Sequence, residues 1–479
     1  MSRHLDVTVG SHAAVQLDTV PMIPLCHLGL REAAVRIFRG EISSEALTRS
    51  CLDRIAERET DILAWAWIDP ERALNRARAA DRAHALRLQA GSDDPVDALP
   101  VAERGVLAGV PIGVKDVIDT AGIPTRMGSP VYQNWVPERS AELVDSLAAS
   151  GAFVMGKTVT TEFAFMVPNK TRNPWNPSRT PGGSSSGSAA AVAAGMVPAA
   201  IGTQTNGSVI RPAAFCGVVG FKPGMGTIST VGMLPFSPTF DQPGVFARDV
   251  SDAALLASWL TRSDGVIGHL PVPLRAAPTL IAVRSPVWDK AQPEQRERFA
   301  ADITILRRAG ATIQERELPP DFADAHRIHR AIMLYEAARI SAKVRRDHRD
   351  NVSDFLNQAL DEGAATSDAD YAAAMRARAG LIGQLAAFIG DGCAGIITPP
   401  AAGEAPGIET TGDPAFCSLW TLCGGPCISL PTGLGPNGMP LGLQLIGRDG
   451  EANYLLAVAA WCEVQFAFEG LLSRTSEAR

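Results

Sequence analysis

The sequence predicts an α/β protein in which one central β-sheet is covered by helices on both faces. Two observations lead to this prediction. From about residue 109 onward, short apolar runs alternate with helical patterns, and such alternation is typical of a sheet packed between helices. The chain also has 479 residues, of which 46% are hydrophobic, so it can bury a large core. We therefore expect a folded globular chain and not a disordered one.

The first hundred residues are predicted to be mainly helical. Apolar residues recur at every fourth position between Leu47 and Ile55, directly after Ser43 and Ser44, which are residue types that cap helix N-termini. A second helix is predicted over 70–89, because it begins with a proline, which is favoured in the first turn. The Gly-Ser-Asp-Asp-Pro run at 91–95 then predicts a surface loop.

The middle of the chain carries the α/β alternation. Its expected elements are a helix over 140–150 and strands over 152–155, 280–283 and 310–313, with a helix over 294–308 between the last two. We expect one domain over 1–479, divided into a helical N-terminal part (1–100), a core (105–260), a helical cap or side layer (318–390) and the C-terminal part of the core (391–479).

Composition excludes several classes of function. The net charge of −7 argues against a general nucleic-acid binder, which needs cations to neutralise phosphates. No run approaches the roughly 18 apolar residues of a membrane span, and the N-terminus lacks the apolar core of a signal peptide. The eight cysteines form no Cys-x-x-Cys pair and are expected to be small buried hydrophobes. We therefore expect a cytoplasmic protein with no nucleic-acid or membrane partner.

Two histidines resemble a pair of metal ligands. His326 and His329 lie three residues apart on a predicted helix, but Arg327 and Arg330 beside them make a metal unfavourable. We expect both histidines on a solvated face, and we expect no metal in the protein.

Lysine is scarce in this chain. Only six of the 44 basic residues are lysines, and a general bias toward arginine explains most of this. Lys115 stands out because it follows the apolar run 110–114, whereas lysine normally prefers the surface. The alternatives are an exposed lysine on an edge strand, or a salt bridge from Lys115 to Asp116 or Asp119.

The segment 181–223 differs in composition from the rest of the chain. Glycine, serine and alanine dominate it, and such small residues let the backbone approach a ligand closely. Its serines precede an alanine-rich helix, whose first N–H groups would point at whatever lies before them. This arrangement suits a site where negative charge develops.

Three interpretations of this segment follow from the residues alone. A phosphate-binding loop fails, because the segment lacks the Gly-Lys-Ser/Thr ending. A serine-hydrolase elbow matches 183–187 formally as G-x-S-x-G, but it needs a histidine late in the chain, and the last one is His348. The third interpretation is structural, a packing seam of small residues within a large sheet.

Three motifs in order resemble those of the amidase signature family. They are Gly-Val-Pro-Ile-Gly-Val-Lys-Asp at 109–116, Pro-Gly-Gly-Ser-Ser-Ser-Gly at 181–187 and Gly-Thr-Gln-Thr-Asn-Gly-Ser at 202–208. The likeness extends from the helices near residue 30 to the run 441–447. It implies a mixed sheet flanked by helices and a Ser–Ser–Lys triad that needs neither metal nor cofactor.

The resemblance assigns roles to individual residues. Ser208 would be the nucleophile, Lys115 the base, and Ser184, next to a cis peptide bond, the relay between them. A serine hydroxyl is a weak nucleophile until a base takes its proton. Lysine serves as that base only when neutral, so its pKa must fall from about 10.4 toward 7, and the apolar run before Lys115 could supply the desolvation.

Further roles follow from the same likeness. Phe163 and Gly183 would contact the substrate, and the oxyanion hole would consist of the backbone N–H groups of Thr205, Asn206, Gly207 and Ser208. The sequence departs from the common pattern in having Gln204 in place of an aspartate, Asn206 in place of a glycine, and Arg211 three places after Ser208 rather than two. These departures argue against assigning a role to an Asp–Arg pair behind the oxyanion loop, and they do not affect the residues of the triad.

The expected activity is hydrolysis of a carboxylic amide through an acyl-enzyme, with an aryl amide, a carbamate or an ester also open as substrate. The alternative is the glutamine-hydrolysing subunit of a tRNA-dependent amidotransferase complex, and a third interpretation is a binding protein that kept only the fold. The sequence leaves the oligomeric state open, a homodimer included.

Overall fold

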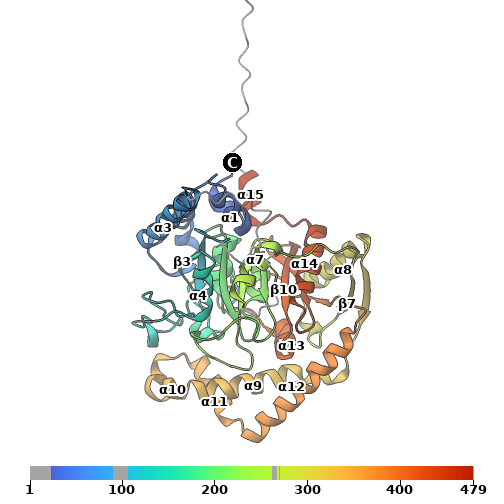
Figure 1. The fold of residues 1–479 in the computed structure, drawn as a ribbon. Coiled ribbons are helices and arrows are strands. Elements are labelled where there is room, and N and C mark those ends of the chain that lie inside the picture. The colour runs from blue at the N-terminus through green and yellow to red at the C-terminus, as the bar shows by residue number, and fades with distance from the viewer. Residues whose placement is uncertain (1–22, 90–105, 262–266, 269, 478–479) are drawn as a thin grey trace, which may run out of the picture.

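The computed structural model describes residues 23–89, 106–261, 267–268 and 270–477, and an 11-stranded β-sheet forms its centre (Figure 1). The strands, in chain order, are β1 (Trp65–Ile68), β2 (Pro111–Lys115), β3 (Phe153–Thr158), β4 (Ala199–Gln204), β5 (Val219–Lys222), β6 (Gln242–Ala247), β7 (Thr279–Val283), β8 (Thr312–Arg316), β9 (Ile396–Thr398), β10 (Cys427–Leu434) and β11 (Pro440–Ile446). They lie in the order β1-β3-β2-β4-β6-β5-β10-β11-β9-β7-β8.

The sheet is mixed, as the resemblance implies. Strand β2 runs parallel to β3 and β4, β7 runs parallel to β8 and β9, and the other pairs are antiparallel. All residues of β2, β4 and β6 are buried, because helices cover both faces of the central strands. The predicted α/β class is confirmed.

The α-helices of the described residues are α1 (Leu30–Phe38), α2 (Ser44–Ile62), α3 (Pro70–Gln89), α4 (Glu142–Ala149), α5 (Ser186–Ala193), α6 (Ile210–Cys216), α7 (Val250–Leu260), α8 (Pro293–Arg308), α9 (Ala325–Ile340), α10 (Ala342–His348), α11 (Asp354–Ala365), α12 (Asp368–Ile389), α13 (Ala415–Cys423), α14 (Ala452–Phe466) and α15 (Leu471–Glu477). Short 3-10 helices occur between them, and one of these, η5 (Glu162–Ala164), lies close to the candidate site described below.

The predicted N-terminal helices are present. Ser43 caps α2, because its side chain accepts a hydrogen bond from the backbone N–H of Ala46, and α3 has the predicted bounds. The short edge strand β1 between these helices was not predicted, and it pairs antiparallel with β3. The loop predicted at 91–95 lies outside the described residues.

Helices α9 to α12 lie together as a layer within 318–390, the range in which a helical cap or side layer is predicted. In Figure 1 they run together along one end of the molecule, beyond α13 and away from α1 and α15. Helix α9 contacts α11, α12 and α13, and α12 also reaches the sheet, because Arg316 of β8 donates to the carbonyl of Phe388. The other boundaries predicted within the chain stay predictions.

All eight cysteines are buried and unpaired, as expected. One stretch, Ala452–Arg474, has the length and hydropathy of a membrane span. Its first part is α14, which packs against α7 and β10 and buries one apolar face that includes Leu455, Leu456 and Val458. A core helix has the same composition, so this stretch is weak evidence for a membrane.

Candidate active site

The three motifs meet at the carboxyl ends of the parallel strands β3, β2 and β4. Lys115 is the last residue of β2 and is fully buried. Its Nζ donates hydrogen bonds to Ser184 Oγ and to Thr203 Oγ1, each at 2.7 Å. Thr203 belongs to β4, the direct neighbour of β2. Sheet pairing therefore fixes the position of the Lys115 amine.

Burial lowers the pKa of Lys115 well below its usual value, because desolvation penalises the charged amine. Asp241 acts in the opposite direction, and it is a weaker influence than the burial. Lys157 and Lys222 are also fully buried, but Lys157 has Asp116 at 3.8 Å and Lys222 donates to two backbone carbonyls. Among these three amines, Lys115 is the one whose closest partners are two hydroxyls.

The salt bridge considered for Lys115 is absent from the described part of the chain. Asp116 instead lies 3.8 Å from Lys157, and it accepts a hydrogen bond from the backbone N–H of Arg126. Asp119 accepts from the indole of Trp135. Adjacent residues on a strand point to opposite faces of the sheet, and this geometry separates Asp116 from the Lys115 amine.

The two neighbouring serines of the middle motif have different partners. The Gly183–Ser184 peptide bond is cis, and the Ser184 hydroxyl accepts from Lys115. Ser185 Oγ donates to the carbonyl of Thr203 and accepts from its N–H, so it ties α5 to β4. Ser185 is the centre of the elbow-like G-x-S-x-G match, and its described partner is this backbone and not a histidine.

Ser208 lies in the loop between β4 and α6, in the wall of a narrow pocket with a volume of about 20 Å³. Thr205, Asn206 and Gly207 line the same pocket, so all four predicted oxyanion-hole residues surround one space. That volume holds about one water molecule. No side chain in the described ranges hydrogen-bonds the Ser208 hydroxyl, and neither Lys115 nor Ser184 is among the residues that line this pocket.

The unusual residues Gln204 and Asn206 anchor this loop. Gln204 Oε1 accepts from the N–H groups of Val209 and Ile210 at 2.8 and 3.1 Å, and its Nε2 donates to Thr421 on α13. Thr421 in turn donates to the carbonyl of Asn206 at 2.5 Å. A neutral amide can cap the start of α6 and donate to a hydroxyl at once, whereas an aspartate can only accept.

Thr205 is held on two sides by residues that were not predicted to belong to the site. Its hydroxyl donates to Asp241 at 2.5 Å, and its carbonyl accepts from His329 Nε2 at 3.0 Å. Desolvation raises the pKa of Asp241 to about 6.

The predicted solvated face for His329 is wrong, because its side chain is buried against Phe240. His326 is partly buried and contacts the carbonyl of Ala415. The arginines at 327 and 330 suggested solvent exposure. The stronger signal was the apolar spacing of Ile328, Ile332 and Met333, which places His329 on the buried face of the helix.

The apolar wall of the pocket comes from several elements, and its members are Ala164, Phe165, Met166, Phe236, Met333 and Pro414. Phe165 stacks on Phe236, with ring centroids 5.3 Å apart. Phe163, which was predicted to contact substrate, is not among the lining residues, and its ring packs edge-on against Tyr132. Phe163 and Ala164 have positive φ values of 48° and 59°, and this turn separates Phe163 from the pocket.

Arg211 lies in the pocket wall and is 2% exposed. Its Nη2 donates to the carbonyl of Gly183 at 2.8 Å, which places Gly183 at the site as a backbone acceptor. Its Nε and Nη1 have no hydrogen-bond partner among the described residues. Burial lowers the pKa of Arg211 to about 10, so the guanidinium stays charged at neutral pH.

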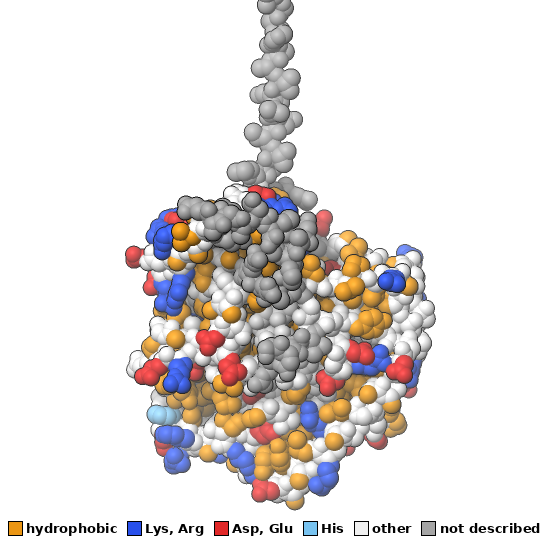
Figure 2. Space-filling view, in the orientation of Figure 1, with side chains coloured by type: hydrophobic (Ala, Val, Ile, Leu, Met, Phe, Trp, Pro, Cys, Tyr) orange, Lys and Arg blue, Asp and Glu red, His pale blue; other side chains and the backbone are white. Residues whose placement is uncertain are grey.

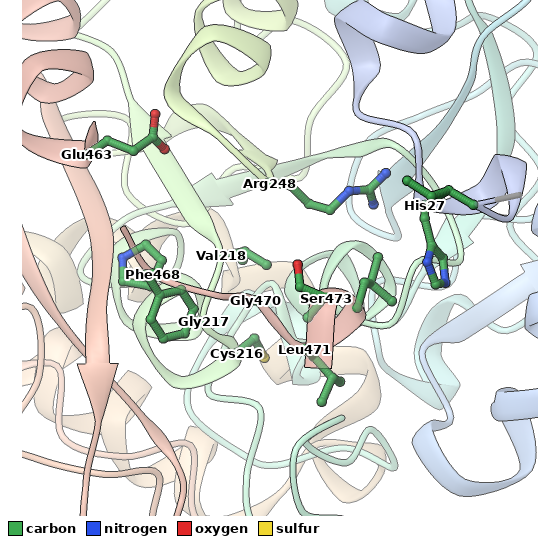
Figure 3. Close-up of a pocket in the computed structure, with 14 residues that line it drawn as sticks. His27, Cys216, Gly217, Val218, Arg248, Glu463, Phe468, Gly470, Leu471 and Ser473 are labelled. Carbon is green, nitrogen blue, oxygen red and sulfur yellow. The ribbon is translucent and has the colours of Figure 1, made fainter. Parts of the chain in front are cut away.

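A larger cavity, of about 410 Å³, contains none of the motif residues (Figure 3). It lies beside Cys216 and Gly217, at the far end of α6 from Ser208, and Arg248 and Glu463 contribute to its wall. Arg248 already donates to the backbone carbonyls of Val192 and Val197. The cavity is therefore separate from the candidate site.

Comparisons of the sequence and of the structure with known proteins point to the same family. The family model described as Amidase matches residues 46–456. A glutamyl-tRNA(Gln) amidotransferase subunit of Anaeromyxobacter sp. strain K is 34% identical, with 90% of this chain and 94% of that protein aligned. A crystal structure of an amidase aligns with 92% of this chain and all of its own at 30% identity and a TM-score of 0.82. The peptide amidase of Stenotrophomonas maltophilia aligns with 92% of this chain and 98% of its own, at 27% identity and a TM-score of 0.76.

Proposed function

The chain belongs to the amidase family, and on this premise we propose that it hydrolyses the C–N bond of a carboxylic amide through an acyl-enzyme on Ser208. The observation that carries the proposal is the buried Lys115 amine, which lies 2.7 Å from Ser184 Oγ and from Thr203 Oγ1. Thr203 is two residues before Thr205, which lines the same pocket as Ser208. A lysine with a depressed pKa whose closest partners are hydroxyls is suited to act as a general base.

In the proposed reaction, Ser208 Oγ attacks the amide carbonyl while its proton passes to Ser184, whose own proton passes to Lys115. The C–N bond breaks when Ser184 returns a proton to the leaving amine. Water then attacks the acyl-enzyme along the same proton path, and the acid is released with Ser208 restored. Each half-reaction returns Lys115 to its neutral form, so no proton accumulates in the buried site.

The oxyanion of the tetrahedral intermediate would bind the backbone N–H groups of the loop from Thr205 to Ser208. One such donor is typically worth about 3–4 kcal/mol in the transition state. The carbonyls of Thr205 and Asn206 are already hydrogen-bonded, to His329 and Thr421. That arrangement supports a rigid loop whose N–H groups face the pocket.

The pocket supports a substrate whose acyl part is largely apolar and carries one hydrogen-bond acceptor. Phe165, Phe236 and Met333 would contact the apolar part. The Nε and Nη1 of Arg211, which have no partner in the described part of the chain, would donate to the acceptor, because a buried charged donor without a partner is costly. Aryl amides, carbamates and esters fit the same description.

A second candidate function is the glutamine-hydrolysing subunit of a tRNA-dependent amidotransferase complex. Its support is the name of the relative that aligns with most of this chain. On the face shown in Figure 2, basic and acidic side chains are interspersed without a broad basic patch. A cytoplasmic location is part of both proposals, because all eight cysteines are unpaired thiols and cytosolic thiols are kept reduced.

The purified chain alone tests the two candidates. We expect it to hydrolyse simple amides or anilides, and glutaminase activity that requires added partner chains would favour the second candidate instead. Ser208→Ala removes the nucleophile, and Lys115→Arg removes the base, because arginine cannot be deprotonated in a protein. Each variant should lower kcat by about 10³-fold or more. Lys343→Arg, at an exposed lysine on α10, is the matched control and should keep full activity. Activity that survives in Ser208→Ala would refute the proposed mechanism.

A further inference from the structure

One face of α9 is directed at the candidate active site. His329, Met333 and Glu336 are spaced at i, i+4 and i+7, which places them on the same side of a helix. His329 contacts Thr205 of the oxyanion loop, Met333 lines the pocket, and Glu336 accepts hydrogen bonds from Ser237 and Thr239. A helix of the peripheral layer thus contacts the site at two points and the adjoining loop before β6 at a third.

The hydrogen bond from His329 defines its tautomer. The Thr205 carbonyl can only accept, so His329 Nε2 must carry the proton. Desolvation lowers the pKa of His329 to about 4, which keeps the ring neutral at neutral pH. The ring also stacks on Phe240, with a centroid distance of 4.4 Å and an interplanar angle of 17°. The donor is therefore held in one orientation.

Because of the geometry of the peptide unit, the hydrogen bond from His329 to the Thr205 carbonyl also affects the N–H groups that face the pocket. A trans peptide unit is planar, and its C=O and the following N–H point in opposite directions. When His329 holds the carbonyl of Thr205, it therefore also sets the direction of the N–H of Asn206. Thr421 has the same relation to the next peptide unit, because it holds the carbonyl of Asn206 and so directs the N–H of Gly207.

We propose that His329 is a positioning residue of the reaction, which directs the Asn206 N–H toward the substrate oxyanion by holding the carbonyl of Thr205. This inference rests on the proposed function. The imidazole does not touch the substrate and exchanges no proton with it. Its removal should raise the barrier of the chemical step more than it weakens substrate binding, because the oxyanion forms only in the transition state.

The decisive variant is His329→Phe, which keeps a ring to stack on Phe240 and lacks the N–H donor. We expect kcat to fall by on the order of tenfold, less than the 10²- to 10³-fold loss for a deleted oxyanion donor, with KM changed by less than about threefold. His329→Gln, whose amide can donate at a similar distance, should recover most of kcat. His326→Ala is the matched control, because His326 is on the same helix and its described hydrogen bond goes to the carbonyl of Ala415, outside the oxyanion loop.

A second readout is independent of substrate identity. The rate at which phenylmethanesulfonyl fluoride modifies Ser208, followed by intact mass, should fall in His329→Phe and recover in His329→Gln. Thermal unfolding of each variant separates positioning from loss of fold. If His329→Phe does not fold, the comparison moves to His329→Asn, which is too short to reach Thr205, against His329→Gln.

Equal kcat and labelling rates in folded His329→Phe and the wild type would overturn the inference, and so would equal activity in the Asn and Gln variants. A loss confined to KM would do the same. The Ser208→Ala variant distinguishes failure of the positioning role of His329 from failure of the proposed function. If Ser208→Ala is inactive while His329→Phe is normal, only the positioning role fails, whereas an active Ser208→Ala refutes the proposed function itself.

Discussion

At the scale of single residues, the surroundings of Lys115 determine its chemistry. Lys115, Lys157 and Lys222 are equally buried, and desolvation lowers the pKa of all three. Lys157 keeps a carboxylate partner, and its pKa falls only to about 8. At Lys115 the charge that opposes the burial is that of Asp241, which is more distant than Asp116 is from Lys157, so the neutral form of Lys115 is favoured.

The charge of Asp241 leads to a prediction for the pH profile. An ionised Asp241 raises the pKa of Lys115, so Asp241→Asn should lower that pKa further. Lys115 would then stay neutral to lower pH, and the acid limb of kcat/KM should move to lower pH than in the wild type. A pH–rate profile with a simple amide measures the shift.

Other groups around Asp241 affect this experiment. Glu336 raises the pKa of Asp241, and the N–H groups of Phe236 and Ser237 donate to its Oδ2. An asparagine keeps only one acceptor oxygen, so the pocket wall at Phe236 should loosen and KM should rise. The position of the acid limb is the diagnostic quantity, and a limb that stays in place or moves to higher pH would contradict the role given to Asp241.

The sequence predicted the site residues unevenly. Lys115, Ser184 and Ser208 could be proposed because each lies in a short motif with a chemical rationale. Asp241 and His329 were missed because they meet Thr205 across 36 and 124 residues of chain. Such contacts depend on strand order and helix docking, and a single sequence carries no local signal for either.

At the scale of secondary-structure elements, α5 shows why the middle motif is rich in small residues. All of its residues are buried, and it packs against β1, β3 and β4. A Cβ added at Gly187 would overlap the backbone of Ala64 and Val159. The close approach of this helix to the start of β1 and the end of β3 brings Ser184 within reach of Lys115. Small residues in this motif are therefore required both for packing and for the chemistry of the site.

Gly187→Ala should therefore destabilise the protein. Backbone atoms cannot yield as a flexible side chain does, so we expect a loss of at least about 1–3 kcal/mol in the free energy of unfolding, measured by denaturant or thermal unfolding. Gly380→Ala is the matched control, because Gly380 lies in α12 with open space around it, and alanine there should stabilise by up to about 1 kcal/mol. Equal stability of the two variants would contradict the packing argument.

At the scale of the whole molecule, the sequence predicted the layers but not the order of the strands. Alternating apolar runs and helical patterns indicate a covered sheet, and β7, α8 and β8 appear near their predicted positions. The pairing of β5 with β10, by contrast, joins segments about 200 residues apart. Pairing partners depend on which edges remain free when the strands assemble, and hydrophobic pattern alone does not encode that choice.

Also at the scale of the whole molecule, one carboxylate joins the helical layer to the loop that precedes β6. Glu336 on α9 accepts hydrogen bonds from the hydroxyls of Ser237, Thr239 and Tyr371, which belong to the loop before β6 and to α12. That loop also carries Phe236 of the pocket wall and ends at Asp241. A single carboxylate thus links two helices of the layer to the loop that supports Thr205.

Removing this carboxylate should loosen the loop without unfolding the sheet. Hydrogen bonds to a charged group contribute about 1.5–3 kcal/mol each, so Glu336→Ala should raise amide hydrogen exchange across residues 236–241, measured by mass spectrometry of digests, while the central strands keep their protection. The control is Glu362→Ala, which removes an exposed carboxylate paired with Arg330 on the same layer and should leave exchange in the loop unchanged. Equal exchange in the two variants would show that the layer is held to the loop by apolar packing alone, and the coupling of α9 to the oxyanion loop would then depend on His329.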